Sequence, residues 1–199
     1  MKYKIIFCLM VSFSMISLAA QAQTSAFTDS RDGRIYQTVK IGDQWWMTEN
    51  LNFSMPDSWC YNKDSANCSN YGRLYTYDAA KESCPSGWHL PGDEEWTTLV
   101  DYLGGEETAG KKLTLTGNKT LGSKYAGVTN ETGFSATAGG NRNVKNVYAL
   151  IGKYGMWWSS TEYNATEAYS RYLYLDNAYF YSHYDKKNCA FSVRCLKNQ

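Results

Sequence analysis

Oxygen-bearing side chains stand at the ends of two expected strands, where they could coordinate a cation. Glu49 and Asn50 end a strand that starts near residue 44, and Glu162 ends a strand that contains Trp157 and Trp158. Calcium prefers carboxylate and amide oxygens. Polar capping of the strand ends accounts for the same residues without a metal, and we favour it. We therefore predict no metal site and no cofactor. If calcium were to bind, its ligands would be Glu49, Asn50 and Glu162.

The two histidines offer acid–base chemistry but lack a recognisable partner. His89 follows Trp88, and a histidine among apolar residues is more often a core hydrogen-bonding group than a catalyst. No serine or cysteine forms a known nucleophile signature with it. His183 lies in a tyrosine-rich strand and is expected on the surface. No catalytic residue is assigned, although an enzyme of this sequence would use Glu49, Glu162 or His89.

Aromatic side chains are the most abundant recognition chemistry, with seven tryptophans and 17 tyrosines. Aromatic faces stack on sugar rings and hold protein interfaces together. The residues predicted to bind a ligand are Trp157, Trp158, Glu162, Tyr172, Tyr174, Tyr179 and Tyr181. Strands bury one face, so we expect at least half of the aromatic set to be structural. The alternating Leu173 and Leu175 are the better core residues.

Five cysteines lie beyond the N-terminal segment: Cys60, Cys68, Cys84, Cys189 and Cys195. No Cys-x-x-Cys pair is present, which argues against zinc. Cys60 and Cys68 are close enough for a local bridge that stabilises its loop by about 2–3 kcal/mol. Cys195 shares a face with Phe191 in the last strand, so we expect it to be buried and bonded to Cys84. Cys189 is then a free thiol.

The first 22 residues have the form of a secretory signal. Lys2 and Lys4 precede an apolar run at 5–18 that is too short to span a bilayer, and Ala20 and Ala22 form a small-x-small cleavage site. Residues 1–22 are therefore predicted to be removed. The remaining chain has no other apolar stretch of membrane-spanning length, so we expect no transmembrane anchor in it.

The mature chain is long enough for one domain, predicted at 31–199 after a short polar lead at 23–30. Loss of two lysines leaves a net charge of −1. Charges of one sign do not form runs, so the sequence does not indicate a nucleic-acid partner.

Periodicity places these residues on a mixture of strands and helices. A hairpin is expected from 34–41 and 44–51 around Gly42, because both segments have strand character and a turn separates them. The best helix is 93–103, capped by Asp93, with an apolar stripe that includes Trp96. A shorter helix is expected at 78–83. Loops with little regular structure are expected at 52–70 and 117–154, and strands at 156–162, 168–175, 179–183 and 190–196.

Several motifs, in order, resemble the Fibrobacter succinogenes major paralogous domain family over about residues 29–198. They are Asp32-Gly33-Arg34 through Asn50-Leu51, Cys60-Tyr61, Tyr71-Gly72-Arg73-Leu74-Tyr75, Cys84-Pro85-x-Gly87-Trp88-His89-Leu90-Pro91 with Glu95-Trp96, Trp157-Trp158-Ser159-Ser160-Thr161-Glu162, and Phe191-Ser192-Val193-Arg194-Cys195. The resemblance implies an α+β domain of C-type lectin-like fold, distantly similar to formylglycine-generating enzymes. In such a domain an antiparallel terminal hairpin, one or two flanking helices and long ordered loops are expected.

The same resemblance implies an exported bacterial domain and no known reaction. A bridge such as Cys84–Cys195 is typical of that fold, whereas Cys189 lies outside the family pattern. We therefore predict a periplasmic, cell-surface or extracellular binding module. It would recognise a glycan or a surface protein through the aromatic loops of residues 106–170. An enzyme of the same fold and a structural envelope protein are the alternatives.

Overall fold

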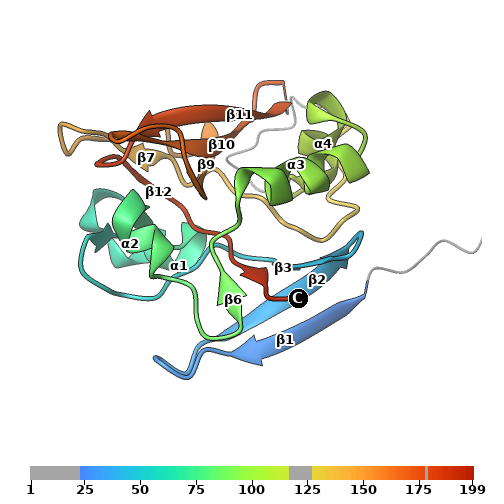
Figure 1. Ribbon diagram of the computed structural model, residues 1–199, viewed down its shortest axis with the longest axis horizontal. Helices are drawn as coiled ribbons and strands as arrows, with labels where there is room; N and C mark the ends of the chain where they lie inside the picture. The colour runs from blue at the N-terminus through green and yellow to red at the C-terminus, as the bar shows by residue number, and fades with distance from the viewer. Residues whose placement is uncertain (1–22, 117–126, 178) are drawn as a thin grey trace, which may run out of the picture.

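The computed structural model describes residues 23–116, 127–177 and 179–199. The predicted signal segment at 1–22 and part of the predicted loop at 117–154 lie outside the described residues. Figure 1 shows one sheet at the top and another at the bottom, with two pairs of helices between them on opposite sides.

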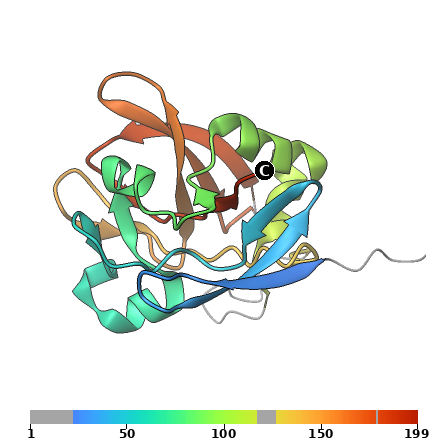
Figure 2. The ribbon, with the colours of Figure 1, turned by 60° about the horizontal axis from the view of Figure 1, so that its bottom comes forward.

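The sheet at the bottom of Figure 1 contains both ends of the described chain and is called the terminal sheet here. Its strands are β1 (Thr24–Thr28), β2 (Ile35–Ile41), β3 (Gln44–Met47), β6 (Trp88–His89) and β13 (Leu196–Lys197). They are antiparallel in the order β1-β2-β3-β13-β6. Figure 2 shows the C-terminal strand beside the first hairpin. The predicted hairpin is confirmed, but its second strand ends at Met47 rather than at residue 51, and the segment expected as a polar lead contributes a strand to the sheet.

The described part of the chain contains two further antiparallel sheets. The upper sheet has the order β11-β10-β9 and consists of β9 (Tyr154–Glu162), β10 (Glu167–Tyr174) and β11 (Tyr179–Lys186). The small sheet has the order β4-β5-β12-β7-β8, with strands Ser58–Trp59, Leu74–Thr76, Ala190–Phe191, Asn141–Arg142 and Tyr148–Ala149 in that order.

Among the described residues, four α-helices and a short 3-10 turn connect the sheets. The helices are α1 (Ser65–Tyr71), α2 (Tyr77–Lys81), α3 (Asp93–Tyr102) and α4 (Glu106–Leu113), and the 3-10 turn is Tyr61–Lys63. Helix α1 lies within the cysteine loop that the sequence predicted to be irregular. Together these elements form an α+β fold with antiparallel sheets, as expected.

Helix α3 confirms the predicted apolar stripe and corrects its cap. Trp96 and Leu99 are completely buried. The N-cap is Gly92, whose N–H donates to Glu95 Oε2 at 2.8 Å. The carboxylate of Asp93 turns instead toward Arg171 in the upper sheet. The carboxylate of Asp93, which the local sequence pattern predicted as the helix cap, therefore forms an ion pair with Arg171 instead.

Two large apolar clusters form the core. The first joins α3 and α4 to the terminal and upper sheets and contains Trp46, Trp96 and Phe180. The second lies beneath α2 and contains Trp158 and Phe191. Large aromatic rings contribute to both clusters, whereas most tyrosines of the described residues are half-buried or exposed.

The segment predicted as a strand at 190–196 is extended but buried on both sides. Phe191 and Cys195 are fully buried as expected, and so are Ser192 and Arg194 on the opposite side. Regular strand pairing is limited to β12 and β13 at its two ends, because the middle residues use their polar groups across the core.

Both predicted disulfides are present. Cys60 and Cys68 are joined within the loop that contains α1, and Cys84 is joined to Cys195 in the buried C-terminal segment. Cys189 is a buried free cysteine. In the part of the chain that the structure describes, no helix is both long and apolar enough to cross a bilayer.

Candidate binding surface on the upper sheet

The register of the upper sheet gathers most of its tyrosines on one face. Tyr174 lies opposite Tyr154 on one neighbouring strand, and Tyr172 lies opposite Tyr181 on the other. Residues directly opposite each other in an antiparallel pair point to the same side. We call the half-buried residues Tyr154, Tyr172, Tyr174 and Tyr181, with the exposed His183, the tyrosine face.

The rings of the tyrosine face are in contact with one another. Tyr154 stacks on Tyr174 with centroids 4.6 Å apart, and Tyr172 stacks on His183 at 5.0 Å. Tyr172 joins the two stacks through an edge contact to Tyr154 at 6.3 Å and also contacts Tyr181 at 5.7 Å. Contacts of this kind add about 0.5–1.5 kcal/mol each beyond area burial, so the rings support one another's positions.

A carboxylate closes one end of the tyrosine face. Asp185 Oδ2 accepts hydrogen bonds from Ser170 Oγ at 2.7 Å and from Tyr172 OH at 2.8 Å. His183 Nδ1 lies 3.4 Å from the same oxygen. These neighbours hold the carboxylate in place beside the rings, where the half-buried Asp185 presents acceptor oxygens at the sheet surface.

Tyr172 and Cys189, which both lie near Asp185, remain protonated at neutral pH. Burial and the adjacent carboxylate raise the pKa of Tyr172 well above its ordinary value. Burial, with a smaller effect of Asp185, raises the pKa of Cys189 to about 11. A neutral thiol is a poor nucleophile, so the geometry favours hydrogen bonding and stacking at this surface over covalent chemistry.

The opposite side of the upper sheet is fixed to helix α3. Arg171, almost fully buried, donates from Nε and Nη2 to Asp93 Oδ1 at 3.0 and 2.6 Å and from Nη2 to Thr97 Oγ1 at 2.8 Å. Ser182 Oγ donates to the same Asp93 oxygen at 3.3 Å. The sheet is therefore a rigid support for the tyrosine face, as a preorganised binding surface requires.

Trp157 and Trp158 do not contribute to a surface, which corrects the prediction that they bind a ligand. Both side chains are completely buried. Trp157 Nε1 donates to Asn50 Oδ1 at 2.8 Å, and Trp158 Nε1 donates to the carbonyl of Tyr75 at 2.8 Å. Strand β9 passes between the core clusters, so its two indoles are enclosed on both sides.

Two further predicted binding residues have partners outside the tyrosine face, although Tyr179 lies opposite Tyr174 in the β10–β11 pair. The hydroxyl of Tyr179 hydrogen-bonds to Glu107 of α4, and this contact raises the pKa of Tyr179. Glu162 forms ion pairs with Lys187 at 3.1 Å and with Lys81 at 3.9 Å. Of the predicted set, Tyr172, Tyr174 and Tyr181 take part in the ring contacts of the tyrosine face.

The three calcium candidates have separate partners. Asn50 is buried, and its Oδ1 accepts from Arg194 Nη2 at 2.7 Å as well as from an indole. Glu49 pairs with Arg34 at 2.7 Å, and Glu162 pairs with lysines. No group of metal-ligating side chains is found among the described residues. Asn50 thus organises the core, a stronger role than the predicted capping of a strand end.

His89 contacts polar groups at the edge of the terminal sheet. Its Nδ1 lies 2.8 Å from Asn198 Oδ1, and its Nε2 lies 2.9 Å from Glu95 Oε1. The half-exposed imidazole therefore links the C-terminus to helix α3. This is the hydrogen-bonding role favoured by the sequence, although the ring lies at the surface rather than in the core.

Sequence reasoning missed Tyr154 and Asp185. Tyr154 begins β9 but fell in the segment predicted to be loop. Asp185 was missed because the predicted strand ended at residue 183, three residues before the end of β11. The alternation of Tyr181, His183 and Asp185 along β11 was the available signal, since residues two apart share a face.

Comparison with known proteins supports the resemblance seen in the sequence. The family model described as Fibrobacter succinogenes major domain matches residues 39–197. Neither the curated proteins nor the solved structures that were searched gave a match. The described geometry therefore carries the functional argument.

Proposed function

The chain belongs to the Fibrobacter succinogenes major domain family, and from this premise we propose that it is an exported module that binds a glycan on the tyrosine face. The observation that carries the proposal is the unbroken ring contact from Tyr174 to His183 beside the carboxylate of Asp185. Aromatic rings supply stacking surface for sugars, and the carboxylate supplies acceptors for sugar hydroxyls.

The shape of the surface favours a glycan chain over a protein. Tyr172 and Tyr174 are two positions apart on β10, about 7 Å along the strand, so successive sugar units can each contact a ring. A stable protein partner needs about 1,200–2,000 Å² of total buried surface. The tyrosine face consists of five side chains, of which Tyr154 and Tyr172 also pack against the second core cluster, so it suits a small ligand better than an interface of that size.

Export is supported by the disulfides and the N-terminal pattern. Two disulfides suit an oxidising compartment, and residues 1–22 have the composition of a secretory signal. Protein recovered from the cell envelope or the medium should begin at Gln23 by mass spectrometry. Recovery of the full-length chain in the cytosol, with free thiols at Cys84 and Cys195, would contradict export.

The C-type lectin-like assignment of the fold belongs to the same proposal. Its support is the terminal sheet, in which β13 lies beside the first hairpin, and the bridge from Cys84 near α3 to Cys195. A superposition of an experimental structure of this chain on C-type lectin domains is the test. Failure of the terminal strands and this disulfide to superpose would reject the assignment.

The binding proposal is tested with glycan arrays followed by titration calorimetry. The protein is purified from an export host with both disulfides intact. Tyr181→Ala should weaken binding of the selected glycan by about 10-fold, since a lost ring contact of about 1.4 kcal/mol is one factor of ten. Asp185→Asn tests the acceptor role separately.

The matched control is Tyr102→Ala, because Tyr102 is an exposed tyrosine on helix α3, outside the tyrosine face. It should bind the glycan as the unmodified protein does. Arrays without any bound glycan would reject the proposal. An equal loss in Tyr102→Ala and Tyr181→Ala would also reject it, because the tyrosine face would then have no special role.

A further inference from the structure

The two edges of the terminal sheet meet. Phe27 lies on β1 and Trp88 on β6, which are the outermost strands of the five. Their rings nevertheless stack with centroids 4.4 Å apart and planes 23° from parallel. The sheet must therefore curl strongly, so that the face carrying Phe27 and Trp88, which borders the second core cluster, lines a trough, in keeping with the twist of short antiparallel strands.

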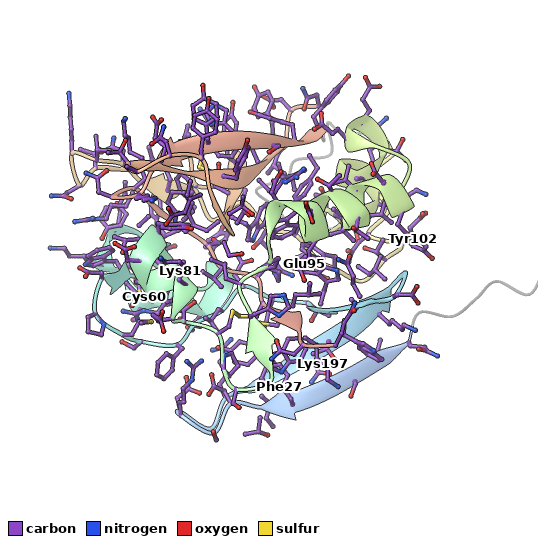
Figure 3. All side chains as sticks on the ribbon, viewed as in Figure 1. Phe27, Cys60, Lys81, Glu95, Tyr102 and Lys197 are labelled. Carbon is purple, nitrogen blue, oxygen red and sulfur yellow. A yellow bond between two sulfur atoms is a disulfide. The ribbon has the colours of Figure 1, made fainter. Side chains whose placement is uncertain are left out.

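Side chains from all five strands line this trough. Ser25 lies opposite Thr38 in the β1–β2 pair, and Lys197 lies opposite Trp88 in the β13–β6 pair. The residues around the cavity are Ser25, Ala26, Phe27, Thr38, Trp45, Trp88 and Lys197. Figure 3 shows the labelled Phe27 and Lys197 toward the bottom of the molecule, near β1 and β6.

The size of the cavity limits what it can hold. Its volume is about 180 Å³, below the ~300–1,000 Å³ of sites for drug-sized ligands. One six-membered ring fits such a space, and a chain of several rings does not. The half-buried rings of Phe27, Trp45 and Trp88 form walls suited to a ring with apolar faces.

The polar groups of the cavity select a negative charge. Lys197 is an exposed lining residue, and its ammonium has no carboxylate partner among the described residues. None of the lining residues is acidic. Lys40 lies opposite Trp45 on the same face of the sheet, and its contact with Asp43 is long, at 3.7 Å. One cation thus lines an aromatic cavity, with a second on the same face of the sheet, and the lining also includes the exposed Ser25 and the buried Thr38.

We infer that the trough of the terminal sheet binds a single carboxylate-bearing sugar ring, a hexuronate. The tryptophan and phenylalanine rings contact the sugar faces, Ser25 and Thr38 meet its hydroxyls, and Lys197 pairs with its carboxylate. An aromatic carboxylate would satisfy the walls and the lysine but not the hydroxyls. This site lies on a different sheet from the tyrosine face and does not depend on the function proposed for that face.

The test is titration calorimetry of the disulfide-intact chain with D-glucuronate, D-galacturonate, methyl glucoside and benzoate. At least one uronate should bind saturably, and methyl glucoside should bind at least about 10-fold more weakly because it lacks the charge. Lys197→Gln should reduce uronate affinity by about 10-fold and leave methyl glucoside unaffected. Lys111→Gln on α4 is the matched control for loss of an exposed lysine.

A second variant tests the cavity itself. Ser25 is exposed on an edge strand, so Ser25→Trp should fold and fill the trough, and it should abolish uronate binding without changing the unfolding midpoint. No saturable uronate binding to the unmodified chain would overturn the inference. Uronate binding that survives both variants would overturn it too, and so would tighter binding of benzoate than of either uronate.

Discussion

The clearest prediction concerns Asn50, whose neutral amide, rather than a carboxylate, accepts hydrogen bonds from the buried cation Arg194. Arg194 is completely buried, and burial lowers the pKa of its guanidinium to about 9, so it remains charged at neutral pH. Asn50 Oδ1 accepts from its Nε at 3.1 Å and from Nη2 at 2.7 Å. The same oxygen accepts from Trp157 Nε1 at 2.8 Å. One amide oxygen therefore satisfies three buried donors.

Replacement of Asn50 by alanine should cost about 4 kcal/mol of unfolding free energy. Hydrogen bonds to a charged group contribute about 1.5–3 kcal/mol each and a neutral one about 1 kcal/mol. The Arg194 Nη1 contacts to the carbonyls of Met47 and Phe134 survive, which keeps the loss below the full sum. Since domains of this size have about 5–15 kcal/mol of stability, the variant should be only marginally folded.

Asn50→Asp separates the role of the oxygen from general disruption of the core. The carboxylate keeps the acceptor beside Arg194 and adds a favourable charge, while the donor to the carbonyl of Tyr71 is lost. We expect a loss of about 1–2 kcal/mol at neutral pH. Asn52→Ala, at a half-buried position two residues away, is the matched control and should cost less than about 1 kcal/mol.

The assay is urea unfolding followed by tryptophan fluorescence, with the disulfides intact, so that the slopes also report any change in cooperativity. If Asn50→Ala costs less than about 1 kcal/mol, the amide oxygen is not the main compensation for the buried cation. If Asn50→Asp costs as much as Asn50→Ala, geometry rather than the acceptor decides stability here. Either result would refute the reasoning.

The disulfides and the buried phenols give further predictions. Paired serine replacement of Cys84 and Cys195, which are 111 residues apart, should cost about 5 kcal/mol by loop-closure entropy, whereas replacement of Cys60 and Cys68, eight apart, should cost about 2.5. Equal losses in urea unfolding would contradict this order. Burial raises the pKa of Tyr36 to about 12 from an ordinary value of 10.0. Between those pH values only the unfolded state releases the proton, so stability should hold up to about pH 10 and then fall. A urea midpoint that stays constant from about pH 10 to about pH 12 would contradict the assignment.

Local patterns predicted the elements whose residues interact with near neighbours. The apolar stripe of α3 and the hairpin around Gly42 follow from spacing within a short window, which is why both were correct. The pairing of Cys84 with Cys195 was also predicted, because the alternation of the last strand placed Cys195 inward. Helix α1 was missed because its polar residues carry no apolar period, although it contains the predicted bridge residue Cys68.

The candidate site was predicted only in part, because exposure is a property of the whole fold. Trp157 and Tyr172 occur in neighbouring aromatic strands, and nothing in their local sequence shows that the first is enclosed while the second is half exposed. Asp93 has the sequence position of a helix cap, yet its carboxylate forms an ion pair with Arg171. In both cases partners far away in the chain decided the outcome.

The sequence by itself determined the family, the α+β class with its antiparallel strands, and the cysteine pairs, since motif order and short-range periodicity encode them. Tertiary structure decided which aromatic rings reach the surface, brought Asp185 beside Tyr172, and curled the terminal sheet until Phe27 met Trp88. The physical reason is that burial, ion pairing and sheet curvature arise from contacts between residues distant in sequence. Such contacts compete with local preferences only when the chain folds.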